Sequence, residues 1–460
     1  MKDRISILGA GESGVGAALL AKAKGFDVFV SDCGQIKENY KQKLISEEIP
    51  FEENIHTPEL IFQAKEIVIS PGIPDKADIV KAAKKNKINI VSEIEFAGRY
   101  TKAKKICITG TNGKTTTTLL THHLLKKAGI NAALAGNVGN SFAEMVLEDK
   151  YDVYVLELSS FQLDRMYNFK ADIAIITNIT PDHLDRYDYK VENYVRAKFR
   201  IIQNMDPNGV FIYNEDSPLL FDELINVDID ARELPFSIEE CTRVAAWGNE
   251  KMFYINPRFD YTSDQNNTND IITINHSKST LKGKHNLYNA MAASLAAACM
   301  GATKEQIEAG LRDFVNAPHR MEIVAQINGV TYINDSKATN VDSAYYALEA
   351  VHKPIIWIVG GVDKGNDYAQ LMELVKKRVK AIVCLGKDNA TVVNAFRGAV
   401  KNIYETHDMA TCVQQCNEIA QDGDVVLLSP CCASFDLFKN YEDRGEQFKK
   451  YVKLNCNPGN

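Results

Sequence analysis

The sequence lacks several features that would place it in other classes of protein. None of its apolar runs reaches the roughly 18 residues that a membrane-spanning helix needs. It has only 27 glycines and 13 prolines, which excludes a collagen-like or low-complexity chain. Its net charge of −7 argues against a protein that coats nucleic acid, because such proteins present a basic surface. We therefore expect no nucleic-acid or membrane partner.

The ten cysteines lack the spacing of a metal site or a disulfide framework. Cys412 and Cys416 are separated by three residues, Cys431 and Cys432 are adjacent, and no C-x-x-C pair occurs. We expect reduced thiols that serve as small core residues. Near the N-terminus, glycines and Glu12 interrupt the apolar segment where a signal peptide would continue. These features predict a cytoplasmic protein.

What the sequence does contain is typical of a globular α/β protein. Hydrophobic residues make up 45% and charged residues 25% of the chain. Short apolar runs, beginning with Ile5–Leu8, alternate with helical stretches. Val153–Leu158 and Ile173–Ile176 are almost wholly apolar, as expected for parallel strands covered on both faces. A polar stretch over 254–276 predicts an antiparallel excursion from such a sheet.

Strands that lead into glycine turns open three successive units of the chain. At about 100 to 200 residues per domain, the length agrees with three domains. The predicted fold is α/β, with a Rossmann-like N-terminal domain, a P-loop ATPase-like central domain and a Rossmann-like C-terminal domain. We expect these domains to cover residues 1–98, 99–317 and 318–460.

The first predicted strand leads into Gly9-x-Gly11-x-x-Gly14, and Asp32 follows the next strand. Glycines at these positions permit a tight turn and let a phosphate approach a helix N-terminus. The pattern is typical of dinucleotide-binding enzymes, but the same turn suits another diphosphate, such as a nucleotide sugar. The motif does not decide between an NAD enzyme and a nucleotide-sugar enzyme, because function belongs to the site and not to the fold.

The motif Gly110-x-x-Gly113-Lys114-Thr115 is a stronger signal, because it follows directly on the predicted strand Lys105–Thr109. It resembles a P-loop, although Ile108 stands where the first glycine of the strict motif belongs. Backbone N–H groups and Lys114 would face phosphates, and the Thr115 hydroxyl could bind Mg²⁺. The motif predicts a shortened phosphate-binding loop.

Three further residues lie where this loop predicts a ligand site. Glu157 ends an apolar strand, where a charge is costly unless it is paired or bound to metal. His183 follows the next strand and either faces the same crevice or is structural. Lys198 borders the apolar stripe of a helix predicted over 191–203. It either extends its amine to solvent or turns toward the active site.

Cations also follow the predicted strands of the third unit. Arg320, Lys337 and Lys364 all lie in segments next to strand ends. Ligands of open α/β sheets bind at the carboxyl ends of the strands, so these cations indicate an anionic substrate.

With these residues in view, the sequence resembles the Mur ligases of bacterial cell-wall synthesis over essentially its whole length. The most specific motifs are Glu157–Leu163 and Asp335–Asn340, which generic P-loop proteins lack. Further matches are Gly136–Gly139, Asn178–His183, His285–Asn289, Pro318–Arg320 and Ser434–Gly445. The resemblance implies that the first domain binds a UDP moiety, the second binds ATP, and the third closes to bring in an amino acid.

Within that family, the resemblance implies a monomeric, ATP-dependent ligase that adds D-glutamate to UDP-N-acetylmuramoyl-L-alanine through an acyl phosphate. The nearest alternative is a sister ligase that adds a different amino acid or acts on folate. An NAD-dependent oxidoreductase leaves Lys114 and Glu157 unexplained. A nucleotide-binding regulatory module without chemistry leaves unexplained the many charged and amide groups at the strand ends.

The resemblance also implies the roles of individual residues. Lys114 would contact the β- and γ-phosphates, and Thr115 and Glu157 would bind one Mg²⁺. His183 and Lys198 would bind a second Mg²⁺, with Lys198 as a carbamate, because an ammonium group cannot be a metal ligand. The other ATP-binding residues would be Gly110, Thr111, Asn112, Gly113, Thr116, Asn289, Arg320 and Asp335. The substrate-binding residues would be Ser13, Gly72, Asn137, Ser159, Lys337, Thr339, Lys364, Ser434 and Tyr441.

Within these sets, Asn289 would read adenine and Asn137 would contact the muramoyl-alanine part. D-Glutamate would be held by Lys337, Thr339 and Ser434, with Lys364 at its second carboxylate. The sequence departs from the family pattern at three places. These are Tyr441 in place of a phenylalanine, Glu12-Ser13 in place of a Leu-Thr pair, and Cys33-Gly34 in place of a Thr-Arg pair.

Overall fold

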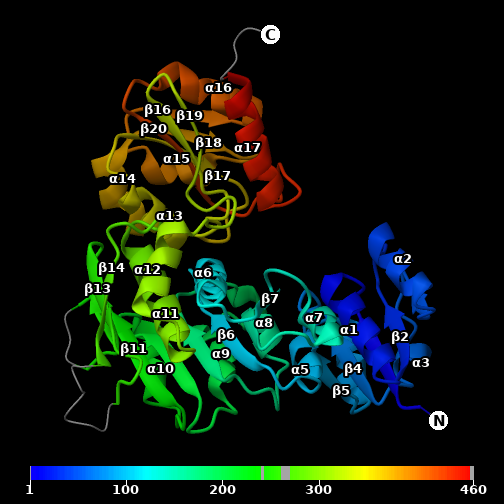
Figure 1. Cartoon of the computed structure of the whole chain (residues 1–460). Helices are drawn as coiled ribbons and strands as arrows, with labels where there is room; N and C mark the ends of the chain where they lie inside the picture. Colours follow the sequence, from blue (N-terminus) through cyan, green and yellow to red (C-terminus); the bar gives the residue numbers. More distant parts are fainter. Residues whose placement is uncertain (1, 240–242, 261–269, 456–460) are drawn as a thin grey trace. The chain divides into compact units, whose positions relative to one another are not determined.

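A computed structural model describes residues 2–239, 243–260 and 270–455. It divides into two compact units, one of Met1–Leu281 with Asn286–Phe314, and one of Lys282–His285 with Val315–Asn460. The described residues form sheets of five, nine and six strands (Figure 1). The first two sheets belong to the first unit and the third sheet belongs to the second unit. The predicted α/β class with three domains is confirmed.

The N-terminal sheet is parallel throughout, in the order β3-β2-β1-β4-β5. Its strands are β1 (Arg4–Leu8), β2 (Asp27–Ser31), β3 (Phe51–Glu52), β4 (Glu66–Ile69) and β5 (Asn89–Ser92). Its helices are α1 (Glu12–Ala23), α2 (Glu38–Ser46), α3 (Pro58–Ile61), α4 (Asp78–Lys85) and α5 (Glu93–Gly98). Because β2 and β4 flank β1, the strand order reverses there, and a crevice for ligands is expected at the carboxyl ends of these strands.

The glycine turn after β1 lies at that crevice and is tightly packed. A Cβ atom on Gly14 would lie 1.8 Å from the carbonyl oxygen of Gly9, so no larger residue fits. A Cβ atom on Gly9 would lie 2.6 Å from Oγ of Ser70, which follows β4. The turn and the Ser70–Ile73 loop are therefore direct neighbours.

The central sheet has the order β14-β13-β12-β11-β10-β9-β6-β8-β7. Its strands are β6 (Lys104–Thr109), β7 (Ala132–Gly136), β8 (Val153–Glu157), β9 (Ile173–Ile176), β10 (Val210–Asn214), β11 (Arg232–Ser237), β12 (Ala246–Gly248), β13 (Met252–Ile255) and β14 (Ile272–Asn275). Among the described strands, the pairs β12–β13 and β13–β14 are antiparallel and the other pairs of this sheet are parallel. Strands β13 and β14 lie at the two ends of the segment 254–276, for which the sequence predicts an antiparallel excursion. Residues 261–269 of that segment lie outside the described residues.

Helices cover both faces of this sheet. They are α6 (Lys114–Lys127), α7 (Phe142–Glu148), α8 (Ser160–Leu163), α9 (Val191–Phe199), α10 (Pro218–Leu224), α11 (Lys284–Cys299) and α12 (Lys304–Asp313), with 3-10 turns η1 (Leu184–Arg186) and η2 (Arg200–Ile202). Apolar residues of α6, α11 and α12 form one core cluster with the sheet. Those of α7, α8 and α9 form another, which continues into the N-terminal sheet. The two domains of the first unit therefore share a core, and α1 and α5 pack against α7 (Figure 1).

Two buried carboxylates on α5 strengthen this shared joint. Glu93 Oε1 accepts hydrogen bonds from Ser141 Oγ at 2.8 Å and from the backbone N–H of Ala143 at 2.6 Å. Glu95 Oε2 accepts backbone N–H groups from residues 167–169. Burial raises the pKa of Glu93 to about 7, and the negative charge of Glu12 contributes to the rise.

The sheet of the second unit has the order β15-β16-β20-β17-β18-β19, with only β15 antiparallel. Its strands are β15 (Glu322–Ile327), β16 (Val330–Asn334), β17 (Ile355–Gly360), β18 (Val379–Leu385), β19 (Ile403–Thr406) and β20 (Val425–Cys431). Its helices are α13 (Val341–Ala350), α14 (Met372–Arg378), α15 (Ala390–Phe396), α16 (Met409–Ile419) and α17 (Tyr441–Asn455), with the 3-10 turn η4 (Tyr368–Leu371). Trp357 is fully buried in the core and donates a hydrogen bond to the carbonyl of Ser429 at 2.8 Å.

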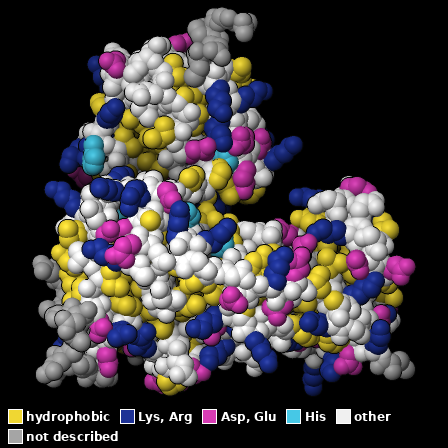
Figure 2. Space-filling model, viewed as in Figure 1, with side chains coloured by type: hydrophobic (Ala, Val, Ile, Leu, Met, Phe, Trp, Pro, Cys, Tyr) yellow, Lys and Arg dark blue, Asp and Glu magenta, His cyan; other side chains and the backbone are white. Residues whose placement is uncertain are grey.

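The charges on the surface and the state of the cysteines agree with what the composition predicts. Acidic and basic side chains alternate over the face of the molecule in Figure 2. Of the cysteines that the structure describes, Cys33 is exposed, Cys299 is half-buried and the others are buried free thiols. No helix in the described ranges combines the length and the apolar character that a membrane span requires.

The buried carboxyl of Glu93 predicts a pH dependence of stability. Its pKa in the folded chain is about 7, above the ordinary value of 4.5 that the unfolded chain retains. The folded state therefore keeps a proton that the unfolded state releases as the pH rises between these two values. Glu93 alone therefore lowers the free energy of unfolding by about 3 kcal/mol over that range. We expect Glu93→Gln, which imitates the protonated acid, to lose less stability as the pH rises.

Denaturant unfolding of both proteins at about pH 5 and about pH 8 measures this difference. Glu250→Gln, at an exposed position, is the matched control and should keep the pH dependence of the unsubstituted protein. Equal losses of stability in Glu93→Gln and in the unsubstituted protein would contradict the assignment.

Candidate functional site

The predicted phosphate-binding loop joins β6 to α6 at the carboxyl edge of the central sheet. Gly110 and Gly113 have φ of +146° and +82°, a region that favours glycine. A Cβ atom on Gly110 would lie 2.0 Å from Thr177 Oγ1, and one on Gly113 would lie 2.4 Å from Asn289 Oδ1. Both glycines are therefore required by backbone conformation and by close packing. The loop ends at the N-terminus of α6, where a helix attracts anions.

Hydrogen bonds fasten this loop to the segment after β9. The backbone N–H groups of Thr111 and Asn112 donate to the carbonyl and side-chain oxygens of Asn178, both at 2.9 Å. Thr111 Oγ1 donates to the carbonyl of Thr180 and accepts its N–H, both at 3.0 Å. The loop that leads to His183 is thereby held against the phosphate-binding loop.

Two lysines converge on the backbone of Gly110. Nζ of Lys114 donates to the carbonyl oxygens of Gly110 and Thr111, both at 2.8 Å. Nζ of Lys198 donates to the same Gly110 oxygen at 2.7 Å and lies 4.5 Å from the centre of the Tyr194 ring. Thr115 and Thr116, which follow Lys114, are buried.

The side chain of Lys198 is only 1% exposed, so the alternative in which its amine reaches solvent is wrong. Burial, and next the positive charge of Lys114, lower the pKa of Lys198 well below its ordinary value. Both effects favour the neutral amine over the ammonium form. Helix α9 is shorter than the predicted 191–203, because the chain tightens into η2 after Phe199.

Glu157 lies at the carboxyl end of β8, as predicted, and is 1% exposed. Its Oε1 accepts a hydrogen bond from Asn137 Nδ2 at 2.7 Å, and its carbonyl accepts the N–H of Asn137 at 2.8 Å. The structure thus joins two residues that the sequence had assigned to metal and to substrate.

His183 follows β9 and so lies at the same carboxyl edge of the sheet as Glu157. Its backbone is in the left-handed conformation, with φ of +53°. Its ring packs edge-on against Phe161 with centroids 5.3 Å apart, and the side chain remains 43% exposed. Within the described ranges, no group of three or more His, Cys, Asp or Glu residues is arranged to hold a metal. Mg²⁺ typically takes one or two carboxylates together with phosphates and water, so Glu157 and the Thr115 hydroxyl fit such an ion.

Two other predicted site residues, Ser159 and Asn289, also have structural contacts. Ser159 caps α8, since its hydroxyl accepts the N–H of Gln162 in a capping box. Asn289 is buried beneath the phosphate-binding loop, where Thr117 Oγ1 donates to its side-chain oxygen at 3.1 Å. A capping box can be recognised from sequence spacing, whereas the placement of Asn289 depends on tertiary packing.

The N-terminal sheet presents Ser13 and Gly72 at its carboxyl edge. Asp32 is already engaged there, because its two carboxylate oxygens accept the N–H groups of Ala10 at 2.7 Å and Gly34 at 2.8 Å. It therefore fastens two loops of the turn region together. In a dinucleotide-binding enzyme the corresponding acid would instead bind a ribose.

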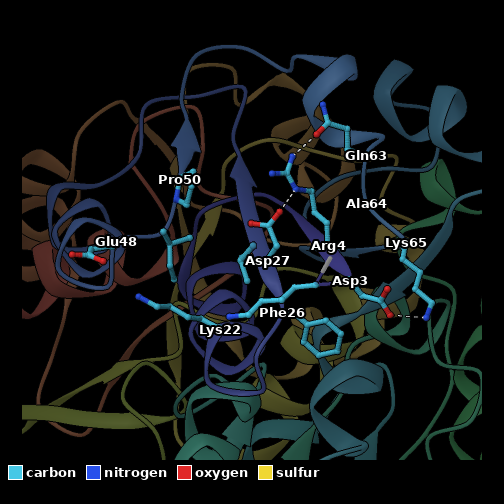
Figure 3. A pocket seen from close by; sticks show the side chains of 13 residues that line it. Asp3, Arg4, Lys22, Phe26, Asp27, Glu48, Pro50, Gln63, Ala64 and Lys65 are labelled. Atoms are coloured by element: carbon cyan, nitrogen blue, oxygen red, sulfur yellow. Dashed lines mark hydrogen bonds and ion pairs between the residues drawn. The ribbon is translucent and has the colours of Figure 1, made fainter.

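A separate cavity of about 880 Å³ lies at the opposite, amino-terminal ends of the strands of this sheet (Figure 3). Two of the cations that line it are paired with anions. Arg4 pairs with Asp27 at 2.6 Å, and Lys65 pairs with Asp3 at 2.8 Å (Figure 3). Because Arg4 and Lys65 are already paired, these two side chains are poor candidates for binding an anion.

The second unit gathers its own set of predicted residues. Asp335 is buried and accepts hydrogen bonds from Ser429 Oγ at 3.0 Å and from the N–H of Met321 at 3.2 Å. Burial raises its pKa to about 7, which these bonds and the charge of Arg320 partly oppose. Burial and the charge of Arg320 also lower the pKa of His285 to about 4.

Three loops of this unit, after β16, β17 and β20, carry the residues predicted to hold the amino acid. Nζ of Lys337 lies 5.2 Å from the centre of the Tyr441 ring. Ser434 is buried, Thr339 is half-buried, and Lys364 is exposed on the loop after β17.

Arg444 is a residue that sequence reasoning missed. It is 2% exposed, and its guanidinium donates to Ser336 Oγ at 3.0 Å, to the Ser336 carbonyl at 2.9 Å and to the Cys432 carbonyl at 3.1 Å. It therefore joins the loop of Lys337 to the loop of Ser434. Its place within the Ser434–Gly445 motif was the signal that could have identified it.

Comparisons with known proteins agree with this arrangement. Family models match for the Mur ligase MurD-like N-terminal domain over residues 3–92, the Mur ligase middle domain over 108–297, and the Mur ligase glutamate ligase domain over 319–432. The UDP-N-acetylmuramoylalanine--D-glutamate ligases of Cytophaga hutchinsonii and Porphyromonas gingivalis W83 are each 51% identical, over 98% of this chain and 99% of theirs.

Solved structures show the same fold at low sequence identity. MurC of Thermotoga maritima matches with a TM-score of 0.59 and 16% identity over 99% of both chains. MurF of Thermotoga maritima, solved with ADP, matches with a TM-score of 0.60 and 16% identity over 95% of this chain and 99% of that one. Since the family models and the full-length relatives together span all three domains, this chain belongs to the Mur ligase family.

Proposed function

We propose that this protein is an ATP-dependent ligase that joins D-glutamate to UDP-N-acetylmuramoyl-L-alanine in the synthesis of peptidoglycan precursors. Relatives that carry this activity in their name are about half identical along the whole chain. The observation that carries the proposal is the group of residues that meets at the carboxyl edge of the central sheet. There a phosphate-binding loop, the buried carboxylate of Glu157 and the buried amine of Lys198 converge.

The first unit would bind the triphosphate at this edge. Backbone N–H groups at the start of α6 and the Lys114 ammonium would face the β- and γ-phosphates. Thr115 and Glu157 would hold one Mg²⁺, and Asn137, which donates to Glu157, would orient that carboxylate. Bound Mg²⁺ would neutralise charge between the γ-phosphate and the acid that attacks it.

Lys198 would serve a second Mg²⁺ together with His183. A neutral amine reacts with CO₂ by forming an N–C bond and releasing a proton, and the product is an anionic carbamate with oxygen donors. The burial of Lys198 and the lowered pKa of its amine support this assignment, because a protonated amine could neither react with CO₂ nor bind a cation.

The reaction would proceed in two steps. The carboxylate of UDP-N-acetylmuramoyl-L-alanine attacks the γ-phosphorus of ATP, and ADP leaves. The amine of D-glutamate then attacks the acyl phosphate, loses a proton and displaces phosphate. Because the first step joins two anions, its barrier is largely electrostatic, and Lys114 and the N-terminus of α6 lower it.

In the second unit, D-glutamate would be held by Lys337, Thr339 and Ser434, with Lys364 at its second carboxylate. Arg444 supports this assignment, since it fixes the two loops that carry Lys337 and Ser434. Asn289, Arg320 and Asp335 would bind the rest of the nucleotide. We further propose that the protein is a monomer and acts in the cytoplasm. Its three domains would cover residues 1–98, 99–317 and 318–460.

The choice of amino acid separates this function from that of a sister ligase. We expect ADP release in the presence of ATP, Mg²⁺, UDP-N-acetylmuramoyl-L-alanine and D-glutamate. L-glutamate, L-lysine, meso-diaminopimelate and D-alanine should each give at most a few per cent of that rate. A coupled assay of ADP measures each rate, and faster turnover with another amino acid would assign the protein to a sister reaction.

Lys114→Ala tests the phosphate-binding loop. We expect ADP formation to fall by about 100-fold or more, because the variant loses a cation at the transferred phosphate. The melting temperature should stay close to that of the unsubstituted protein. Lys126→Ala removes an exposed lysine from the other end of α6 and should keep full activity. Full turnover in Lys114→Ala would refute the role of the loop.

Carbamylation of Lys198 can be observed directly. Intact-protein mass spectrometry under native conditions in bicarbonate buffer should show one CO₂ adduct. The adduct should be absent from Lys198→Ala and present in Lys126→Ala. An active protein without any adduct, or an adduct that persists in Lys198→Ala, would disprove the assignment.

A further inference from the structure

A guanidinium in the first unit touches two loops that the proposed function assigns to substrate and metal. Arg186 is the last residue of η1, three positions after His183. Its Nη2 donates a long hydrogen bond to the carbonyl of Pro71 at 3.4 Å, next to Gly72. Its Cζ lies 4.2 Å from the centre of the Phe161 ring, well within the range of a cation–π contact.

The Phe161 ring connects Arg186 to the carboxyl edge of the central sheet, where Glu157 and His183 would hold metal. Phe161 lies on α8, four residues after Glu157. Its ring packs edge-on against His183 at 5.3 Å and stacks on Tyr187 at 6.1 Å with an interplanar angle of 17°. The guanidinium therefore joins a loop of the N-terminal domain to the ring against which His183 packs.

The turn that carries Arg186 is anchored without it. Tyr187 is buried, and its hydroxyl donates to Asp164 Oδ2 at 2.9 Å. The Tyr187 ring also packs against Tyr194 at 5.4 Å, and the Tyr194 hydroxyl lies 3.2 Å from Thr111 Oγ1 in the phosphate-binding loop. Removal of the half-buried Arg186 side chain should therefore leave the fold intact.

The charges around Arg186 are satisfied by other partners. Arg186 lines a small polar cavity of about 30 Å³ between the two domains of this unit, together with Asp75, Asp164 and Arg165. Asp75 pairs with Arg165 and with Lys84. In the described part of the chain Arg186 forms no ion pair with a carboxylate, so its contacts are the ring and the Pro71 carbonyl.

We propose that Arg186 is a positioning residue that couples the Ser70–Ile73 loop, which would hold the nucleotide-linked acid, to Phe161 and His183. Through this contact, the acid held by the N-terminal domain is aligned with the γ-phosphate held by the central domain. Because a misalignment of about 1 Å can cost about 100-fold in rate, loss of the contact should act on turnover more than on binding. The proposal rests on the proposed function.

The experiment compares Arg186→Met with Arg186→Lys. Methionine keeps apolar packing on Phe161 but removes the charge, whereas lysine keeps a cation for the ring and one donor for the carbonyl. For Arg186→Met we expect kcat for ADP release to fall by about 10- to 100-fold. The Kd of UDP-N-acetylmuramoyl-L-alanine, measured by calorimetry without ATP, should change by less than about threefold. Arg186→Lys should recover most of the lost rate.

Two further variants separate positioning from a general structural effect. In a Phe161→Leu background, Arg186→Met should cause little additional loss, because residues that act through one contact are not additive. Arg196→Met, at an exposed arginine of α9, should match the unsubstituted protein in both kcat and Kd. Melting temperatures of all variants should agree closely.

The outcomes are distinct. Unsubstituted protein that releases no ADP would contradict the proposed function itself. Active unsubstituted protein together with full kcat in Arg186→Met would overturn only the positioning role. That role would also be overturned by a rise in Kd at constant kcat, which would indicate direct substrate binding, or by a lowered melting temperature with no recovery in Arg186→Lys.

Discussion

The carbonyl oxygen of Gly110 accepts hydrogen bonds from two lysines, and the candidate site depends on that convergence. Lys114 reaches it from the start of α6 and Lys198 reaches it from α9, at 2.8 and 2.7 Å. Burial, and next the positive charge of Lys114, lower the pKa of Lys198 and so favour its neutral form. A neutral amine beside a phosphate-binding loop is a reactive group, whereas an exposed lysine of the same helix would only solubilise the surface.

The geometry around that carbonyl follows from the order of the parallel strands. β6 lies between β8 and β9, so the glycine loop, Glu157 and the segment leading to His183 all emerge at one edge. The segment after β9 donates and accepts the hydrogen bonds that shape the loop. The site that we propose for polyanions consists largely of backbone N–H groups, a helix N-terminus and one buried carboxylate. Such a site suits a protein whose net charge is negative.

The N-terminal and central domains form one unit because they share an apolar core and a polar joint. Glu93 and Glu95 extend from α5 to backbone donors of the central domain. Arg186 lies at the same joint and links loops from both domains. In the second unit Arg444 has a comparable structural position, since it ties two loops through hydrogen bonds to their backbone. In both units a buried or half-buried arginine organises loops whose own sequences carry the predicted ligand contacts.

The sequence by itself determined the α/β class, the position of most strands and the group of motifs at their carboxyl ends, because apolar runs and glycine turns are local signals. It also identified Glu157 and Lys114 as candidate site residues. Tertiary structure alone decided that Lys198 is buried and not solvated, that Asp32 binds backbone N–H groups, and that Asn289 lies beneath the phosphate-binding loop. Only tertiary structure brought Arg186 to Pro71, which lies 115 residues away in the chain. Burial and pairing depend on segments distant in sequence, and a local pattern carries no information about which distant segment will cover it.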